Sequence, residues 1–373
     1  MHSSTSVSNS VSNSVSENDY TLVVPARRSL GRIALITLGL SLTILAGWEI
    51  FVRLQGYEAS LQDGHDLWAS VRSEVSKNPE STVLIGGSRM LFDFNLDAYE
   101  KLTGTRPIQL ATVGTNATDY LEDLANEESW KGTVIIGITP SLWFAPPGSP
   151  PVANARKSLD HYRSWAPSER IGHRLDRLLQ SFVAFLNEDD LTLKKMLERL
   201  PIENRQNAAI GPPLPPYMHT VDADRQGRLW PRVEEDETLR ARISSGWMAL
   251  FTPPPPPPGV TPDQARQQFI KHVQAHVNRT AALVGKIQDR GGKVIFVRFP
   301  STGPLRELES KFTPRPFFWD PMIQISGAPG IHFEDYAQLQ GFDCPEGSHL
   351  SAEGAREFTE RLTPLLQKKL SGR

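Results

Sequence analysis

Two short segments far apart in the chain carry residue types that suit nucleophilic chemistry. Ser88 follows two glycines, Gly86 and Gly87, which allow a tight turn and the close approach of a substrate. Near the other end of the chain, Glu346 precedes His349 across a glycine-containing turn. A carboxylate at this spacing could orient the imidazole while the second ring nitrogen faces a nucleophile. Each of these segments alone is more often only a structural turn. Whether they form one reactive site depends on the strands and helices that position them.

The chain around these motifs alternates between strand-like and helix-like segments. Apolar runs of strand length, most of them rich in β-branched residues, are separated by segments of helical length. This alternation predicts a parallel sheet in an α/β fold. The expected strands are Thr82–Ile85, Ile108–Val113, Thr133–Ile138, Lys293–Phe299 and the short Ile331–Phe333, and the expected helices are Leu91–Leu102, Thr118–Glu127, Pro262–Asp289 and Ser351 to about Lys369, with Ser351 as an N-cap and Pro364 as a residue that could kink or divide the last helix.

Ligands of open parallel sheets bind at the carboxyl ends of the strands. Ser88 follows the first expected strand, and Gly114 follows the second. The unobstructed backbone N–H of Gly114 could serve as an oxyanion donor. His349 comes just before the last helix. Along the chain, a first strand is followed by Gly-Ser88 and a second strand by Gly114. Glu346 and His349 come much later, just before a final helix.

This order resembles the SGNH (GDSL-like) hydrolase superfamily, in particular its membrane-anchored branch related to alginate and cellulose O-acetylation proteins. The resemblance covers residues 80–140 and about 290–369. It implies a flavodoxin-like three-layer α/β sandwich. It also implies that Ser88 is the nucleophile, Gly114 an oxyanion glycine and His349 the general base, with Glu346 where the family usually has Asp.

The chain departs from the family pattern at two places. Glu346 is one methylene longer than the usual Asp, and Asp343 is a nearby substitute. The third-block asparagine of the family is absent, and Asn116 or Thr139 could supply the missing polar contact. Arg89 could contact an acidic substrate, although pairing with a carboxylate of the fold is the commoner role of such an arginine.

The resemblance implies acyl transfer through an ester on Ser88. His349 would remove the Ser88 proton, Glu346 would stabilise the imidazolium, and Ser88, Gly114 and Asn116 would hold the oxyanion. This chemistry requires no metal or cofactor. The implied substrate is an acylated envelope or exported polysaccharide, or a small ester, and the implied partner is a membrane-embedded acyl donor.

A membrane anchor is expected near the N-terminus. A nearly unbroken apolar run begins at Ile33 and is closed by Arg53, and about 20 residues match a hydrocarbon core of about 30 Å. A cleaved signal peptide is the competing interpretation, but no clear Ala-x-Ala site follows the run. The arginines before the run favour a cytoplasmic N-terminus and a periplasmic remainder of a single-pass protein; they are Arg27, Arg28 and Arg32.

Composition excludes several other classes of function. The 373 residues carry 40 Lys+Arg against 42 Asp+Glu, a net charge of -2 with no long basic run after the first arginines, which argues against nucleic-acid binding. The single cysteine, Cys344, excludes an internal disulfide and leaves no thiolate partner for a zinc or iron–sulfur site. The protein could still lie in any redox compartment.

The expected organisation combines these segments. Six consecutive prolines, Pro253–Pro258, and the tract Gly211–Pro216 indicate rigid connectors within an insertion. The expected divisions are a disordered cytoplasmic tail (1–29), a transmembrane anchor (30–53), a stalk (54–80), the first part of the SGNH-like domain (81–144), a Pro-rich and helical insertion with a helix near Arg174–Arg199 (145–260) and the second part of the domain (261–373).

Two alternative functions and two further candidate sites stay open at this stage. The missing asparagine and the Glu substitution fit a catalytically silent scaffold or carbohydrate-binding subunit of a polysaccharide assembly complex. The Gly-Gly-Ser turn could cradle a nucleotide phosphate, but it lacks the lysine of a P-loop. His272 and His276 share a helix face as zinc ligands can, with a solvated face as the commoner explanation. Five tryptophans could stack on sugar rings, although aromatic residues are usually packed: Trp143, Trp165, Trp230, Trp247 and Trp319, with the best cluster at Phe317–Trp319.

Overall fold

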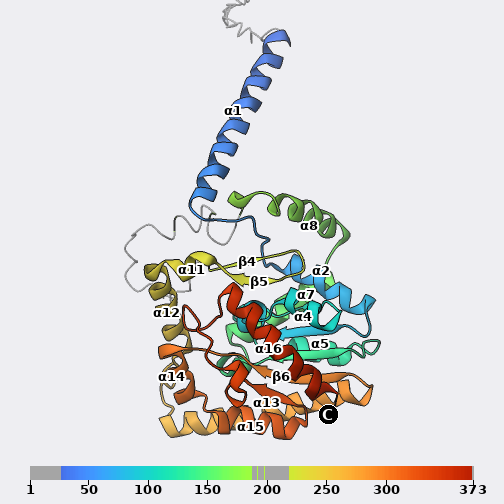
Figure 1. Ribbon diagram of the computed structural model, residues 1–373, viewed down its shortest axis with the longest axis vertical. Coiled ribbons are helices and arrows are strands. Elements are labelled where there is room, and N and C mark those ends of the chain that lie inside the picture. Colours follow the sequence, from blue (N-terminus) through green and yellow to red (C-terminus); the bar gives the residue numbers. More distant parts are fainter. Residues whose placement is uncertain (1–26, 187–190, 192–196, 198–217, 372–373) are drawn as a thin grey trace, which may run out of the picture. The chain divides into compact units, whose positions relative to one another are not determined.

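The computed structural model (Figure 1) describes residues 27–186, 191, 197 and 218–371. The chain divides into two compact units, one ending at Phe51 and one beginning at Val52. The first unit contains most of helix α1 (Arg27–Leu54). Its stretch Leu30–Leu54 is long and apolar enough to cross a membrane, and only 6% of the most hydrophobic window is buried. Most of the expected tail, 1–29, and the tract Gly211–Pro216 lie outside the described residues.

A parallel sheet of five strands forms the centre of the second unit. The strand order is β2-β1-β3-β6-β7, which in chain order is the 2-1-3-4-5 arrangement of flavodoxin-like doubly wound folds. In such a sheet the strand order reverses between β1 and β3, and the crevice outside their carboxyl ends is the usual binding place. The strands are β1 (Thr82–Gly86), β2 (Ile108–Gln109), β3 (Thr133–Gly137), β6 (Lys293–Arg298) and β7 (Gly330–His332).

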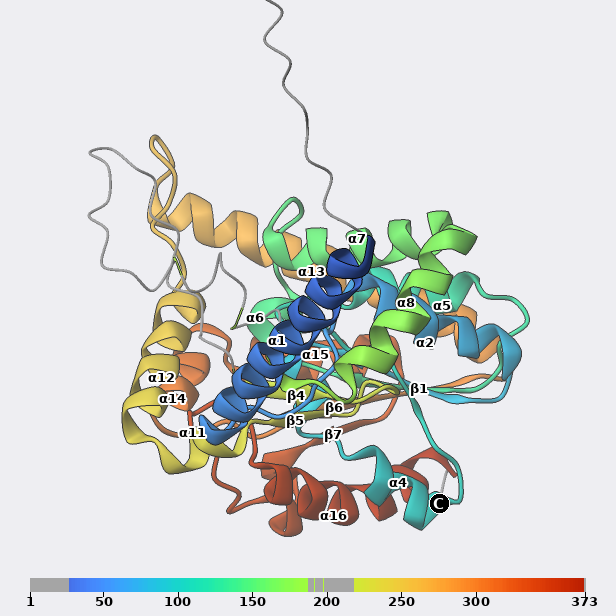
Figure 2. The same ribbon diagram turned by 90° about the horizontal axis from the view of Figure 1, so that it is seen from above.

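Helices cover both faces of this sheet because its strands are apolar on both faces. Val83 and Ile85 of β1 join one core cluster, whereas Leu84 between them joins the other. Figure 2 shows α4 and α16 on one side of the sheet and α5, α7 and α13 on the other.

The helices divide between the two cores as follows. The first core contains side chains of α2 (His65–Lys77), α5 (Thr118–Asn126), α6 (Pro140–Trp143), α7 (Pro150–Ser164), α13 (Pro262–Asp289) and α15 (Arg315–Ser326). The second contains side chains of α3 (Ser88–Phe92), α4 (Leu96–Thr103), α11 (Pro231–Glu235), α12 (Glu237–Phe251), α14 (Gly303–Phe312), α16 (Ala352–Leu370) and β5 (Gly227–Leu229). Strand β4 (His219–Val221) pairs with β5, and its Val221 packs with Leu61 and Leu67 in a small separate cluster. Helix α8 (Pro167–Gln180) contributes no residue to either core, and short 3-10 turns cover Ala184–Leu186, Phe333–Asp335 and Ala337–Leu339.

The local sequence signals explain several boundaries. Helix α13 spans the predicted residues, and α16 begins after Ser351, whose hydroxyl accepts the Gly354 N–H at 3.0 Å. Pro364 lies inside α16 without dividing it. The single helix predicted over Leu91–Leu102 is wrong, because Asn95 caps a new helix, α4, through the Ala98 N–H.

The expected stalk and insertion are not separate bodies. Within residues 54–80, Trp68 and Val75 of α2 are buried in the first core, so α2 is a core helix and not a stalk. Within residues 145–260, Leu159 of α7 belongs to the first core and Trp247 of α12 to the second. The helix expected near Arg174–Arg199 begins earlier, at Pro167, and α8 ends at Gln180. Residues Pro253–Pro258 are exposed and form neither helix nor strand.

Candidate active site

Ser88 lies where the sheet topology predicts a binding crevice, directly after β1. The turn before it requires glycine, because a Cβ on Gly86 would lie 2.8 Å from the carbonyl oxygen of Gly137 at the end of β3. A Cβ on Gly87 would lie 3.1 Å from Leu142 Cδ1 and 3.7 Å from the carbonyl oxygen of Thr115. The loops after β1, β2 and β3 therefore meet around the serine, which is only 8% exposed.

His349 lies against this serine. Its Nε2 is 2.8 Å from Ser88 Oγ, and its Nδ1 is 2.6 Å from Glu346 Oε1. An ionised carboxylate only accepts hydrogen bonds, so Nδ1 carries the proton and Nε2 is free to accept the serine proton. The three side chains form a continuous Ser-His-Glu triad.

The loop that holds Glu346 is shaped by its own backbone. Gly347 has φ +94, and this left-handed turn lets the Glu346 carboxylate fold back onto the following residues. Oε1 also accepts the His349 N–H at 2.8 Å, and Oε2 accepts the Ser348 N–H at 3.0 Å. Glu346 and His349 are almost completely buried, so these bonds are shielded from water.

Helix α12 completes the surroundings of the triad. The indole N–H of Trp247 donates to Glu346 Oε2, and the Trp247 ring lies 5.5 Å from the His349 ring, centroid to centroid. Ser244, one turn earlier, donates to the Glu346 carbonyl oxygen at 2.9 Å. The sequence analysis considered Trp247 only as a sugar-stacking residue and did not consider Ser244. The segment expected to be an insertion therefore supplies direct partners of the triad.

Helix α3 fixes the histidine loop as well as the serine. Arg89 Nε donates to the Ser348 carbonyl oxygen at 3.0 Å, and Asp93 Oδ1 accepts the Leu350 N–H at 2.9 Å. Complete burial raises the pKa of Asp93 well above its usual range, although the Leu350 N–H and the Arg89 guanidinium oppose this shift. Asp93 was not among the candidate residues; a lone acid between Phe92 and Phe94 is the sequence signal that could have identified it.

Arg89 is buried and pairs with a carboxylate of the fold, the commoner of the two roles considered for it. It is 2% exposed, and its Nη2 lies 2.8 Å from Glu309 Oε1. Glu309 also pairs with Arg298 at 2.5 Å. Burial opposes the ionisation of Glu309, but the guanidinium groups of Arg298 and Arg89 lower its pKa to about 2. This buried network ties α3 to α14 and to the end of β6.

The backbone N–H groups of Ser88 and Gly114 are available as oxyanion donors. Neither donates to another group in the described part of the chain. Gly114 has φ +61 and is partly exposed in the loop after β2, which passes beside Gly87. Both N–H groups therefore lie in the loops that follow the neighbouring strands β1 and β2.

Asn116 does not have the free amide expected of an oxyanion donor. Its Nδ2 donates to the Trp143 carbonyl oxygen at 2.5 Å, its Oδ1 accepts the Thr118 N–H, and its backbone N–H donates to Pro151. The residue therefore shapes the loop after β2. Thr139 is 4% exposed and occupies the N-cap position of the short α6 after β3, where its side chain makes no capping hydrogen bond.

The remaining candidates lie away from the triad or have other partners. Asp343 contacts Thr302 at 3.4 Å, so Glu346 and not Asp343 bonds to the histidine. His276 lies 3.0 Å from Thr118 Oγ1 and is buried, and His272 lies 3.1 Å from the Phe144 carbonyl oxygen. Within the described ranges, no group of three or more His, Cys, Asp or Glu side chains is arranged to hold a metal ion.

Comparisons with known proteins do not assign the chain to a family. The sequence matches no protein-family model, and it has no significant match among curated proteins. The interpretation of the site therefore depends on its own geometry.

Proposed function

We propose that the protein is a membrane-anchored serine esterase or O-acyltransferase of SGNH type. The observation that carries this proposal is the continuous contact from Glu346 through His349 to Ser88, with distances of 2.6 and 2.8 Å. The Gly-Gly-Ser turn after β1 and the order of the strands also support it. The third-block asparagine is missing, and the Glu346 carboxylate stands in place of the usual Asp.

The first step forms an ester on Ser88. His349 Nε2 accepts the hydroxyl proton as Ser88 Oγ attacks the acyl carbonyl carbon, and Glu346 stabilises the imidazolium. The N–H groups of Ser88 and Gly114 are the proposed donors to the oxyanion. Collapse of the tetrahedral intermediate transfers the proton from His349 to the leaving alcohol and leaves acyl-Ser88.

The second step reverses these roles with a new acceptor. Water or a sugar hydroxyl gives its proton to His349 and attacks the acyl carbon, and Ser88 recovers its proton when the ester bond breaks. With water the protein is an esterase, and with a sugar hydroxyl it is a transferase. We propose an acylated envelope or exported polysaccharide as the substrate or acceptor, and a membrane-embedded protein as the acyl donor in the transferase case.

We also propose a single-pass anchor with its N-terminus in the cytoplasm. Helix α1 supplies the apolar span, and arginines precede it. The unit from Val52 onward, which holds the triad, would then lie outside the cytoplasm, where an exported polysaccharide is accessible.

The test is turnover of an ester by the full chain in detergent. p-Nitrophenyl acetate should be hydrolysed by the wild type, and acetate should be transferred or released when an acetylated polysaccharide is supplied. Ser88→Ala should abolish both activities, whereas Ser129→Ala, which removes an exposed hydroxyl after α5, should leave them unchanged. Equal turnover by wild type and Ser88→Ala would contradict the proposal.

A further inference from the structure

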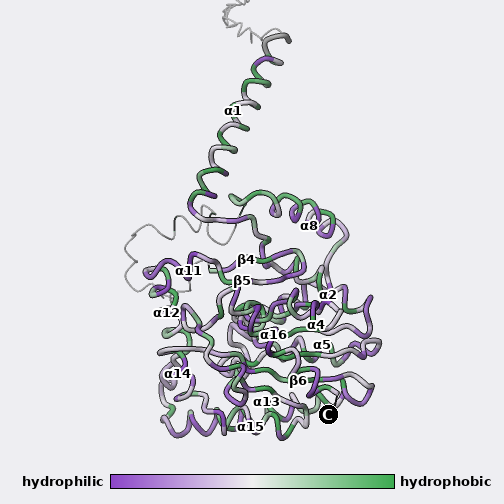
Figure 3. Tube along the Cα trace, in the orientation of Figure 1, coloured by the Kyte–Doolittle hydropathy of each residue, from purple (hydrophilic) through white to green (hydrophobic). Residues whose placement is uncertain are grey.

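Helix α8 has the reverse of the usual amphipathic arrangement. Its large apolar side chains recur at the spacing of one helix face, and they are between 56% and 70% exposed. In a helix of a water-soluble protein this face packs on the core. Figure 3 shows the hydrophobic positions recurring along α8. The apolar face consists of Ile171, Leu175, Leu178 and Leu179, with Phe182 continuing it in the turn after the helix.

The polar face of α8 is the one that contacts the rest of the unit. Gln180 is the buried residue of the helix, and its Oε1 accepts the Gln62 N–H at 2.8 Å. The His173 ring lies 6.0 Å from the Trp165 ring, and the Arg170 guanidinium lies 5.1 Å from the same ring. The orientation of α8 is therefore fixed by these contacts, and its apolar face points away from the protein.

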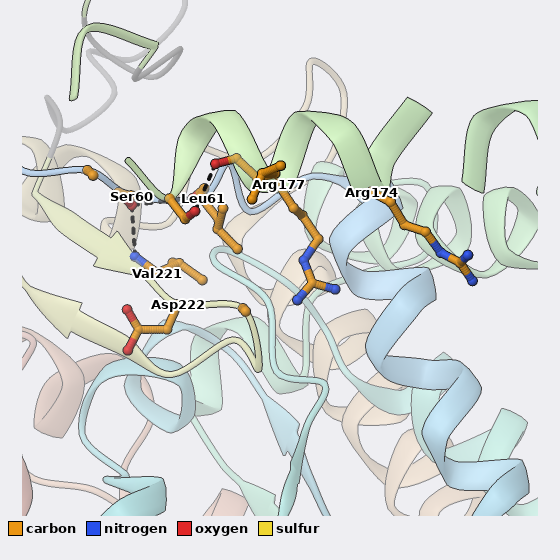
Figure 4. A pocket seen from close by; sticks show the side chains of 10 residues that line it. Ser60, Leu61, Arg174, Arg177, Val221 and Asp222 are labelled. Carbon is orange, nitrogen blue, oxygen red and sulfur yellow. Dashed lines mark hydrogen bonds between the residues drawn. The ribbon is translucent and has the colours of Figure 1, made fainter. Parts of the chain in front are cut away.

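The side chains beside the apolar face are mainly basic. Three arginines stand against two acidic residues in α8, and Arg174 and Arg177 line a pocket of about 370 Å³ with Ser60 and Asp222. Figure 4 shows both arginines projecting from α8 toward the rest of the unit, Arg177 toward the β4–β5 hairpin and Arg174 farther along the helix. A helix with an outward apolar face and a polar face that carries the arginines has the pattern of helices that lie in a membrane interface.

Chain connectivity places this helix close to the end of the apolar span. Arg53, in the last turn of α1, donates from Nη2 to the Phe182 carbonyl oxygen at 2.9 Å. Gln62, bonded to Gln180, follows the span by only a few residues. If Leu30–Leu54 crosses a bilayer, the end of α8 is held within one side-chain length of the point where the chain leaves the hydrocarbon.

We propose that α8 lies in the surface of the bilayer that α1 crosses, with its apolar face among the headgroups and upper acyl chains. The occupant of this face is lipid, because the face is apolar, points away from the protein and belongs to a helix bonded to the end of the membrane span. This second attachment holds the unit from Val52 onward against the membrane by α8 as well as by α1. The inference rests on the anchoring part of the proposed function and is independent of the ester chemistry.

The test measures how close three positions lie to lipid. Single cysteines replace Leu175 on the apolar face, Asp176 on the neighbouring polar side and Leu38 in α1, each in the full chain. The unmodified chain is the labelling blank, because its one cysteine, Cys344, is 2% exposed. Each cysteine carries an NBD fluorophore, and the protein is placed in phosphatidylcholine–phosphatidylglycerol vesicles with and without phosphatidylcholine that bears a 5-doxyl group.

The predicted result is quenching at Leu38→Cys and Leu175→Cys to about half the emission or less, with much weaker quenching at Asp176→Cys. Quenching at Leu38→Cys with equal, weak quenching at the two α8 positions would overturn the proposal while leaving the anchor intact. Weak quenching at both α8 positions is the result expected if another part of the chain or a second copy of it, and not lipid, covers the apolar face. Lack of quenching at Leu38→Cys would overturn the anchoring itself.

Discussion

His349 Nε2 lies 2.8 Å from Ser88 Oγ although 261 positions separate the two residues. Two contacts from α3 hold them at this distance, one from Arg89 to the Ser348 carbonyl oxygen and one from Asp93 to the Leu350 N–H. Residues of α3 and its C-cap, which follow Ser88, thus hydrogen-bond to Ser348 and Leu350, the two neighbours of His349. This arrangement explains how a loop before α16 can be held in hydrogen-bonding register with a turn after β1.

Glu346→Gln should reduce kcat by about 10²–10⁴-fold with the fold intact. The amide cannot stabilise the imidazolium, and its NH2 group could hold the ring in the wrong tautomer. The measurement is steady-state ester hydrolysis by the full chain. Asp343→Asn is the matched control, because Asp343 contacts Thr302 and not the histidine; an equal loss in both variants would contradict the assignment of Glu346.

Trp247→Phe should lower kcat about tenfold, or ~1.4 kcal/mol in barrier, with KM nearly unchanged. Phenylalanine keeps most of the packing on the His349 ring but removes the N–H that donates to Glu346. The pH dependence of kcat should shift as well, because Trp247 acts through the carboxylate. An unchanged kcat and pH profile would show that Trp247 only packs.

Asp93→Asn should keep the unfolding free energy at pH 7 within about 1 kcal/mol of wild type, whereas Asp93→Ala should lose about 1–3 kcal/mol. Asparagine still accepts the Leu350 N–H, and alanine leaves it unpaired. Because burial raises the folded-state pKa of Asp93, the wild type should lose stability as pH rises above about 4, the ordinary pKa of Asp. Denaturant titrations at several pH values should show that loss in wild type and not in Asp93→Asn.

His276 should make the protein less stable in mild acid. Burial, with the nearby His272, lowers the pKa of His276 to about 4 from its ordinary 6.5. The unfolded chain therefore binds a proton that the folded protein does not, and stability falls as pH decreases from 6.5 to 4. His276→Gln should lose about 1–3 kcal/mol less than wild type over this window in chemical denaturation. If the unfolding free energy of the two proteins changed equally with pH, protonation of His276 would not be the cause of the loss.

Sequence patterns predicted the parts of the fold that follow local rules. The apolar runs predicted the strands β1, β3 and β6 closely, and β2 proved shorter than Ile108–Val113 because it pairs with β1 only at Ile108 and Gln109. Helix α15, which contains Pro321, was not predicted. Tertiary packing of its buried Phe318 and Met322 outweighs the unfavourable proline.

The partners of the triad were harder to predict than its members. Ser88, His349 and Glu346 have recognisable spacings beside glycines, whereas Trp247 lies far from each of them in the chain. Its role follows from the packing of α12 beside the loop before α16, which no local pattern encodes. The exposed apolar face of α8 was also missed, since its spacing alone is the same as that of a core helix.

The most direct test of the catalytic claim is labelling of the full chain with a serine-reactive fluorophosphonate. The reagent phosphonylates a serine only when a neighbouring base activates it, so the geometry predicts one modified residue, Ser88, by peptide mass spectrometry. Labelling should disappear in Ser88→Ala and in His349→Ala and persist in Ser129→Ala. A folded wild type that is not labelled, or labelling that survives Ser88→Ala, would contradict an activated Ser88 and favour a non-catalytic scaffold.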